Sequence, residues 1–318
     1  MNCTNNQNQI NVGIDTGKHN LDIYIHPLDI FFTVTNDDKG IKQAIKEIKK
    51  YKPTRIVIEA TGRLEHPFVL ACSKAKLPFC VANPQRIRNF AKSNGQLAKT
   101  DALDARIIAQ FGEAIKPPLS QVKPDMLQRM SDLVARRRQL MAMQTMEKNH
   151  MKSMPKHLAS SIKPVLTALK NQLDKVDAKI AKLIESSDDY QAKSDIIQSV
   201  PGVGKVVAYN LLSNMPELGH ITNKQAAALV GVAPINRESG SYYGKRHIQG
   251  GRYQIRTVMY MAMMSAIQCN PIFKSTYEKL LAKGKPKKVA LVACVRKMIV
   301  ILNSMVRDGV LWDQNMAK

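Results

Sequence analysis

Cysteine, aromatic residues and long apolar runs are scarce in this chain. The 5 cysteines form no CxxC pair, so we expect reduced thiols and no zinc site. We find no apolar run near the ~20 residues that cross a bilayer, and no basic amphipathic anchor, which argues against a membrane protein. The opening residues, MNCTNNQNQI, lack the charged and apolar regions of a signal peptide. We therefore expect a cytoplasmic protein.

Acidic residues are also few. The chain has 25 Asp and Glu against 48 Lys and Arg, which gives a formal net charge of +23. Such an excess indicates a polyanionic partner, and without a membrane segment nucleic acid is favoured. The 318 residues are enough for two domains, each with its own core.

Short β-rich runs alternate with helical periodicity in the first part of the chain. INVGID, LDIYIHP and IFFTV predict three neighbouring strands, and TRIVIEA and LPFCVAN predict two more. GIKQAIKEIKKY has apolar residues at helical spacing, and a helix is expected over residues 64–74. This alternation predicts an α/β domain over residues 1–120, with ligands near the carboxyl ends of its strands.

Beyond residue 120 the β signal almost disappears. Two long, charged, periodic segments joined around Pro155 and Pro164 predict an antiparallel coiled-coil arm over residues 121–192. Its methionine-rich stripe is interpreted as a packing surface. Residues 193–318 predict a mainly α domain that is interrupted by two glycine-rich passages, SVPGVGK and ESGSYYGKRHIQGGR.

Four carboxylates of the first domain fall where metal chemistry would need them. Asp15 and Glu59 end two predicted strands, and Asp101 and Asp104 share one face of a predicted helix. Gathering four carboxylates costs several kcal/mol of repulsion unless a cation lies between them. A pair of Mg²⁺ ions meets this requirement and suits phosphate-transfer chemistry.

Two basic residues and two other interpretations belong to the same motifs. Lys99 and Arg106 flank the acidic pair and are predicted to face phosphate. A DxxD pair on a helix is, however, often a solvated face, and Thr100 before it is typical of a helix cap. NVGIDTGK also fits the phosphate loop of actin-like ATPases, but the further glycine-rich turn and adenosine loop of that fold are not found.

The two glycine-rich passages are the candidate nucleic-acid contacts of the second half. IIQSVPGVGKVVAYNLL predicts a helix-hairpin-helix element, in which the backbone could approach a phosphate, although an ordinary turn between helices is also consistent. Tyr242 and Tyr243 could stack on bases. His247 is assigned a structural or phosphate-contacting role. The residues predicted to contact nucleic acid in these passages are Gly202, Gly204, Lys205, Arg237, Lys245, Arg246, Arg252 and Arg256.

Two loop hydroxyls, Ser239 and Ser241, lie among these arginines. A serine beside glycine is most often a turn former. Beside guanidinium groups that bind phosphate, it could instead be a nucleophile that attacks a phosphodiester.

These motifs resemble those of the transposases of insertion-sequence family 110, which are related to Piv-type invertases. The resemblance includes GIDTGK, IEATG and AKTDALDARIIA in the first half, and VPGVG, LVGVAP and SGSYYGKRHIQGGRYQIRTVMYMA in the second. It covers almost the whole chain apart from the leader and the arm.

The resemblance implies an N-terminal RuvC-like domain of ribonuclease H topology and a C-terminal transposase domain with a nucleophilic serine. Asp15, Glu59, Asp101 and Asp104 would hold Mg²⁺, or alternatively Mn²⁺. The family serine maps to Ser239, with Ser241 as the alternative, and forms a covalent phosphoserine link to DNA.

The family also implies the partners. They are donor and target DNA, a structured noncoding bridge RNA that pairs with both, and further copies of the chain in homodimers and homotetramers, where the carboxylates of one subunit meet the serine of another. The place of action would be the bacterial cytoplasm, at the nucleoid.

Three functions remain open on the sequence alone. The favoured one is a DNA transposase or recombinase that uses both the metal site and the serine. The second is a metal-dependent, structure-specific nuclease such as a junction resolvase, in which the serine has no part. The third is a non-catalytic nucleic-acid-binding protein.

Overall fold

A computed structural model describes residues 9–96 and 100–315, and the chain divides into two compact units. The units are Met1–Lys123 and Pro124–Lys318. The three-part division made from the sequence stays a prediction. In the structure, the two long helices that follow residue 124 share a hydrophobic core with the later helices.

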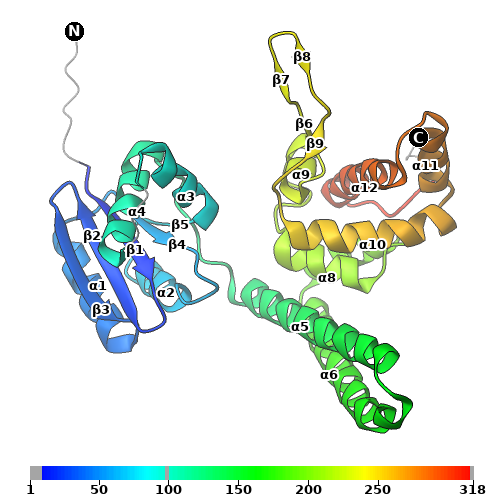
Figure 1. The fold of residues 1–318 in the computed structure, drawn as a ribbon, viewed down its shortest axis with the longest axis horizontal. Helices are drawn as coiled ribbons and strands as arrows, with labels where there is room; N and C mark the ends of the chain where they lie inside the picture. Colours follow the sequence, from blue (N-terminus) through cyan, green and yellow to red (C-terminus); the bar gives the residue numbers. More distant parts are fainter. Residues whose placement is uncertain (1–8, 97–99, 316–318) are drawn as a thin grey trace. The chain divides into compact units, whose positions relative to one another are not determined.

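The first unit contains a five-stranded mixed sheet (Figure 1). Its strand order is β3-β2-β1-β4-β5. The first three strands are antiparallel because only short turns join them, whereas β4 and β5 run parallel to β1 because helices carry the chain back. The strands are β1 (Asn11–Thr16), β2 (Asn20–His26), β3 (Ile30–Thr35), β4 (Arg55–Glu59) and β5 (Phe79–Ala82). The α/β prediction is confirmed.

Helices cover the sheet of the first unit. The side chains of Ile14, Ile23 and Ile58 belong to the main core of the unit, together with buried residues of α1 and α2. Residues next to them along the strands contact α4, because successive side chains of a strand point to opposite faces. The helices are α1 (Asp38–Lys50), α2 (His66–Lys74), α3 (Pro84–Ser93) and α4 (Asp101–Ile115).

The turn before α2 differs from the prediction. The helix begins at His66, two residues later than expected. The side-chain carboxylate of Glu65 accepts hydrogen bonds from the backbone N–H groups of Thr61 and Arg63, at 3.1 and 3.0 Å. These bonds hold the preceding residues in a turn, and the helix starts only after it.

Close contact between α4 and β1 depends on Gly13. A Cβ atom at this position would overlap the carbonyl oxygen of Ala105 and the backbone nitrogen of Ala109. Only glycine allows the helix backbone to lie directly on the strand here.

We therefore expect Gly13→Ala to lower the free energy of unfolding of the first unit by about 1–3 kcal/mol, because the overlapping atoms are backbone and cannot rotate away. Urea denaturation followed by circular dichroism measures the change. A shift below about 0.5 kcal/mol would contradict the close packing described here.

The second unit begins with two long helices that pack along each other, α5 (Asp125–Ser153) and α6 (Ala159–Glu185), with η1 (Lys156–Leu158) between them. Arg137 of α5 donates to the carboxylate of Asp177 of α6, with 2.6 Å between Nε and Oδ1. The helices run antiparallel, as expected. Coiled-coil packing stays a prediction. Pro164 lies inside α6, so the helix starts earlier than the sequence suggested.

Within the described residues, six further helices follow in this unit, and α12 is central among them. By length and composition α12 could cross a membrane, so the expectation that no apolar run comes near this length is wrong for Lys287–Asp308. Half of its apolar window is buried in the unit, including Cys294, Met298 and Leu302, so it fits the core helix of a folded domain. The helices are α7 (Asp188–Gln198), α8 (Lys205–Asn214), α9 (Asn223–Val230), α10 (Tyr253–Cys269), α11 (Pro271–Ala282) and α12 (Lys287–Asp308).

Between α9 and α10 the chain forms a narrow two-stranded projection, which we call the finger (residues 234–248; Figure 1). Its base pairs β6 (Pro234–Ile235) with β9 (His247–Ile248), and its outer part pairs β7 (Glu238–Ser239) with β8 (Tyr242–Tyr243). The sequence predicted a glycine-rich loop here, and these very short strands were not foreseen.

Candidate nucleic-acid-processing sites

Two of the predicted carboxylates meet at the carboxyl ends of neighbouring strands. The parallel pairing of β1 with β4 joins Gly13 to Val57 and Ile14 to Ile58, so the next step brings Asp15 beside Glu59. Val57 lies close to Gly112 of α4. Glu59, two residues further on, faces the same side of the sheet as Val57.

The other two carboxylates come from the start of α4. Gly112 of this helix approaches Asn11 at the start of β1, whereas Ala105 approaches Gly13, so helix and strand run in opposite directions. The first turn, with Asp101 and Asp104, therefore lies toward the end of β1 that carries Asp15. Thr100 caps the helix, since its hydroxyl oxygen accepts a hydrogen bond from the backbone N–H of Leu103 at 3.4 Å. The predicted cap and the acidic pair occupy the same turn.

The electrostatics of Asp15 reflect this grouping. Burial raises its pKa above the ordinary value, and the carboxylates of Asp104, Asp22 and Asp101 raise the pKa further, against a lowering hydrogen bond from the backbone N–H of Thr16. Desolvation and like charge both disfavour an ionised carboxylate. Asp15 thus lies half-buried and close to other carboxylates. We call Asp15, Glu59, Asp101 and Asp104 together the acidic edge.

A fifth carboxylate, Asp22, was missed by the sequence analysis. It is buried on β2, directly opposite Asp15 in the antiparallel pairing, and its Oδ1 accepts a hydrogen bond from the Thr33 hydroxyl at 2.6 Å. The available signal was the alternation in LDIYI, which places Asp22 on the same face of the strand as Tyr24. Tyr24 packs with Ala105 of α4, so Asp22 belongs to the face that carries the acidic edge.

The acidic edge suits a divalent cation in its chemistry. Carboxylate oxygens are the ligands that Mg²⁺ prefers, and a cation would relieve the repulsion around Asp15. Over residues 9–96 and 100–315, however, no three Asp, Glu, His or Cys side chains are gathered closely enough to hold a metal as they stand. The fold thus brings the four acids to one edge without placing them in ligand positions.

Asp15→Asn tests this repulsion. A raised pKa means that ionised Asp15 destabilises the fold increasingly as the pH rises above the ordinary value of 3.8. We expect the variant to melt at a higher temperature than the wild type at neutral pH without divalent cations, and the difference to disappear below about pH 4.

Adding Mg²⁺ should raise the melting temperature of the wild type more than that of the variant, because binding to the folded state stabilises it. Differential scanning fluorimetry with and without Mg²⁺ measures both effects. Equal Mg²⁺ responses of the two proteins would contradict a cation site that includes Asp15.

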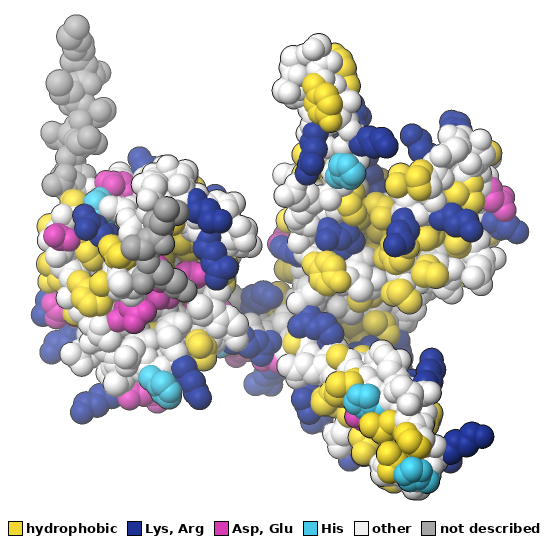
Figure 2. Space-filling model, viewed as in Figure 1, with side chains coloured by type: hydrophobic (Ala, Val, Ile, Leu, Met, Phe, Trp, Pro, Cys, Tyr) yellow, Lys and Arg dark blue, Asp and Glu magenta, His cyan; other side chains and the backbone are white. Residues whose placement is uncertain are grey.

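Of the two basic residues that flank the acidic pair, the structure describes Arg106 alone, and phosphate contact by either stays a prediction. The Arg106 guanidinium lies 5.8 Å from the centre of the Tyr24 ring, in a cation–π contact on the sheet. Lys99 lies outside the described residues. On the face that Figure 2 shows, acidic side chains form a group on the first unit, and Lys and Arg are spread over both units.

Both candidate serines are at the tip of the finger. Ser239 pairs with Tyr242 across the hairpin, and Ser241 lies in the two-residue turn after Gly240, whose φ is 55°. Both serines are exposed, as are Tyr242 and Tyr243, which are 67% and 79% exposed. Either hydroxyl could reach an extended substrate.

Basic side chains accompany the serines along the finger. Arg237 and Lys245 are exposed, and Arg246 pairs with Glu238, with 3.3 Å between nitrogen and oxygen. These positions suit phosphate contacts, which stay a prediction.

Two other predicted phosphate ligands hold the base of the finger. Arg252 makes a bidentate pair with Glu217, with both N–O distances 2.7 Å, and donates to the carbonyl of Asn214 at 2.8 Å. Arg256 donates to the carbonyls of Gly231 and Gly250, at 3.1 and 2.6 Å. In this structure both guanidinium groups fix the direction in which the finger leaves the helices. Phosphate binding by either stays a prediction.

The PGVG turn joins α7 to α8, and its two glycines differ. Gly202 has a φ of 91°, and a Cβ there would lie 2.5 Å from the Cα of Ala266 in α10. Gly204 precedes α8, and apart from its own chain neighbours no described atom lies within 4 Å of the place where its Cβ would be. Gly202 thus serves packing, whereas Gly204 is open to an approaching phosphate. Lys205 has its Nζ 3.6 Å from Asp177 Oδ2.

This difference gives a matched pair of variants. We expect Gly202→Ala to lower the free energy of unfolding by about 2–4 kcal/mol, because both the left-handed backbone and the contact with α10 oppose a Cβ. Gly204→Ala should change it by less than about 1 kcal/mol. Urea denaturation of both variants measures the two changes in the free energy of unfolding. Equal changes would contradict the packing role of Gly202.

Two models of known protein families match the chain, one in each half. A family model for the DEDD transposase of IS110 matches residues 12–160, and one described as the transposase of the IS116/IS110/IS902 family matches residues 194–278.

The similar proteins include pilin gene-inverting proteins. That of Moraxella bovis is 25% identical over 317 residues, covering 95% of this chain and 97% of the relative, and that of Moraxella lacunata matches equally. The 43.6 kDa IS110 protein of Streptomyces coelicolor is 30% identical over 166 residues, 50% of this chain and 38% of the relative.

A solved structure is also similar in part. It is T. thermophilus RuvC in complex with a Holliday junction substrate, with a TM-score of 0.29 and 12% identity. The match covers 36% of this chain and 99% of that one.

The two family models, which follow one another along the chain, define a transposase, an enzyme that acts on DNA. The chain belongs to the IS110 family of DEDD transposases. The resemblance seen in the sequence is confirmed.

Proposed function

We propose that this transposase cuts and rejoins the DNA of an insertion sequence through a covalent phosphoserine. The observation that supports this most is the convergence of Asp15, Glu59, Asp101 and Asp104, all within the matched DEDD region, at one edge of the sheet. The exposed serine among basic side chains, in the second matched region, supplies the nucleophile.

The serine chemistry uses groups of the finger. The Oγ atom of Ser239 attacks a backbone phosphorus, the new Oγ–P bond forms, and the P–O bond to the neighbouring nucleoside breaks. The departing oxygen takes up the proton that the serine hydroxyl gives up and becomes a free hydroxyl. A free hydroxyl of the other cut DNA then attacks the phosphoserine phosphorus, which joins the two strands, and the serine oxygen leaves with a proton. Arg237 and Lys245 contact the phosphate oxygens, where negative charge increases during the attack.

The acidic edge would hold Mg²⁺, or alternatively Mn²⁺, through Asp15, Glu59, Asp101 and Asp104. When bound, the cation polarises a phosphate oxygen and lowers the barrier to attack. The four residues position the cation, and Asp22 with its Thr33 hydrogen bond keeps the surroundings negative. Gly13 maintains the closeness of α4 on which this arrangement depends.

Nucleic-acid partners follow from the charge and the chemistry. The net charge of +23 suits donor and target DNA together with a structured bridge RNA, because every neutralised phosphate releases counterions. In such a system base pairing between RNA and DNA would read the sequence, and the protein would recognise backbone and shape. The action takes place at the nucleoid of a bacterial cell.

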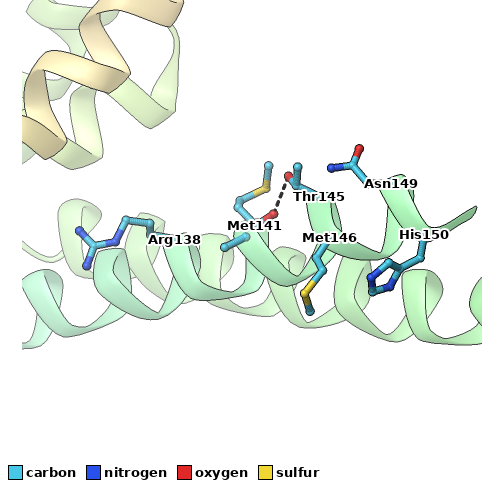
Figure 3. A pocket seen from close by; sticks show the side chains of 7 residues that line it. Arg138, Met141, Thr145, Met146, Asn149 and His150 are labelled. Carbon is cyan, nitrogen blue, oxygen red and sulfur yellow. Dashed lines mark hydrogen bonds between the residues drawn. The ribbon is translucent and has the colours of Figure 1, made fainter. Parts of the chain in front are cut away.

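A homodimer, and from it a homotetramer, would use the outer face of α5. This face carries a groove of about 680 Å³ lined by Met141, Thr145, Met146 and His150, among others (Figure 3). Met141 and Met146 are 37% and 51% exposed. These two methionines lie on different sides of α5 and give the helix exposed, flexible apolar surface that a second copy of the helix could cover.

Met146→Lys should weaken this self-association at least about tenfold, because it places a charge in the apolar interface. Met261→Lys is the matched control, since Met261 is 60% exposed on α10, away from the groove. Sedimentation velocity over a concentration series compares the proteins. Identical behaviour of the two variants would contradict an α5 interface.

Ser239→Ala tests the covalent step. With Mg²⁺, bridge RNA and cognate DNA, the wild type and Ser241→Ala should form a protein–DNA adduct that survives denaturing electrophoresis, whereas Ser239→Ala should form none. The reverse pattern would assign the nucleophile to Ser241. Cleavage without any adduct in all three proteins would instead support a metal-dependent nuclease.

Asp104→Asn separates the transposase from a protein that only binds nucleic acid. Cleavage should fall by at least about a hundredfold, while binding, measured by fluorescence anisotropy, should change little. If Asp104→Asn cleaved DNA as fast as the wild type, the proposed metal site would be contradicted.

A further inference from the structure

A pocket of about 310 Å³ lies at the base of the finger, where β9 approaches α12. Its apolar lining includes Val232, Ile248, Val289 and Val292. Two of these side chains are unusually open to solvent: Val289 is 52% exposed and Ile248 is 36% exposed. The pocket therefore offers apolar surface that a ligand could cover.

Cationic side chains line the same pocket. Arg246, Lys288 and Arg296 contribute to its walls, together with His247. Arg246 pairs with Glu238, which is next to Ser239. Lys288 and Arg296 are exposed and have no acidic partner within the described part of the chain, and no described acidic side chain lines the pocket. Apolar surface beside unpaired positive charge suits a ligand that has both an apolar ring and a negatively charged group.

We propose that this pocket binds one unstacked nucleotide of the DNA strand that the enzyme cuts, with the base on the valines and its phosphates on Arg296 and Lys288. The inference rests on the proposed function, because it extends the DNA path from the serine. The volume is at the lower end of the ~300–1,000 Å³ usual for ligand sites, which fits a single nucleotide. Enzymes that hold such a nucleotide enclose its base between apolar side chains.

The distance of the pocket from Ser239 along the finger is consistent with a nucleotide of the same DNA strand. Ile235 pairs with His247 at the base, and Ser239 is four residues further toward the tip, about 13 Å at ~3.3 Å per residue. The pocket would therefore hold a nucleotide a few positions along the strand from the attacked phosphate. Arg246 connects the two places through Glu238.

The test uses the full chain and a series of short single-stranded DNAs, each with one abasic site at a different position. Fluorescence anisotropy gives the dissociation constants. We expect the affinity of the wild type to fall about tenfold at one position and little elsewhere, since a stacked base contributes at about this level. The position effect should disappear in Ala293→Trp, which fills the pocket.

Ala282→Trp is the matched control, because Ala282 is exposed at the end of α11 and does not line the pocket. It should keep the wild-type pattern. A second variant, Arg296→Gln, changes only an exposed side chain and should reduce the slope of log affinity against log salt by about 1.

The outcomes separate this inference from the function on which it rests. Failure of the wild type to bind any of the DNAs would contradict the proposed function. Binding that no abasic position weakens, or a position effect that persists in Ala293→Trp, would overturn the pocket alone. The same series made in RNA is the remaining comparison, and a position effect found only with RNA would overturn the assignment to DNA.

Discussion

The contact between Gly13 on β1 and the backbone of α4 determines where the acidic side chains of the first unit lie. Because no side chain separates strand from helix, the first turn of α4 comes down over the end of β1. Asp101 and Asp104 then share the surroundings of Asp15, whose carboxyl has a pKa raised first by burial and further by these carboxylates. The parallel pairing of β1 with β4 adds Glu59. A helix held farther away by a side chain would leave two separate acidic pairs.

The repulsion within this edge is a property of the folded unit without a cation. Asp22, opposite Asp15 and fixed by Thr33, adds to it. Carboxylates that repel one another, and whose repulsion a divalent cation would relieve, are typical of catalytic sites. In the second unit, by contrast, arginines hold the base of the finger and lie along it.

Much of the first unit could be predicted from the sequence, because strand runs and helical periodicity are local signals. The positions of Asp15 and Glu59 at strand ends and of Thr100 as a cap follow from such signals. Asp22 could not be recognised in the same way, because its nearness to Asp15 depends on strand register. The strands of the finger could not be predicted, because its paired segments are only two residues long and show no alternation. For Arg252 and Arg256, charge alone could not distinguish a phosphate ligand from a partner of Glu217 or of backbone carbonyls.

The central claim is that Asp15, Glu59, Asp101 and Asp104 together hold a divalent cation. Anomalous diffraction from a crystal soaked in Mn²⁺ tests this most directly, because it locates the ion and its ligands. The account predicts a strong peak at the acidic edge, with carboxylate oxygens of Asp15 and of at least one residue from α4 at about 2.0–2.6 Å. Four acids pointing apart around an edge that holds no peak, while Mn²⁺ is bound elsewhere, would contradict it.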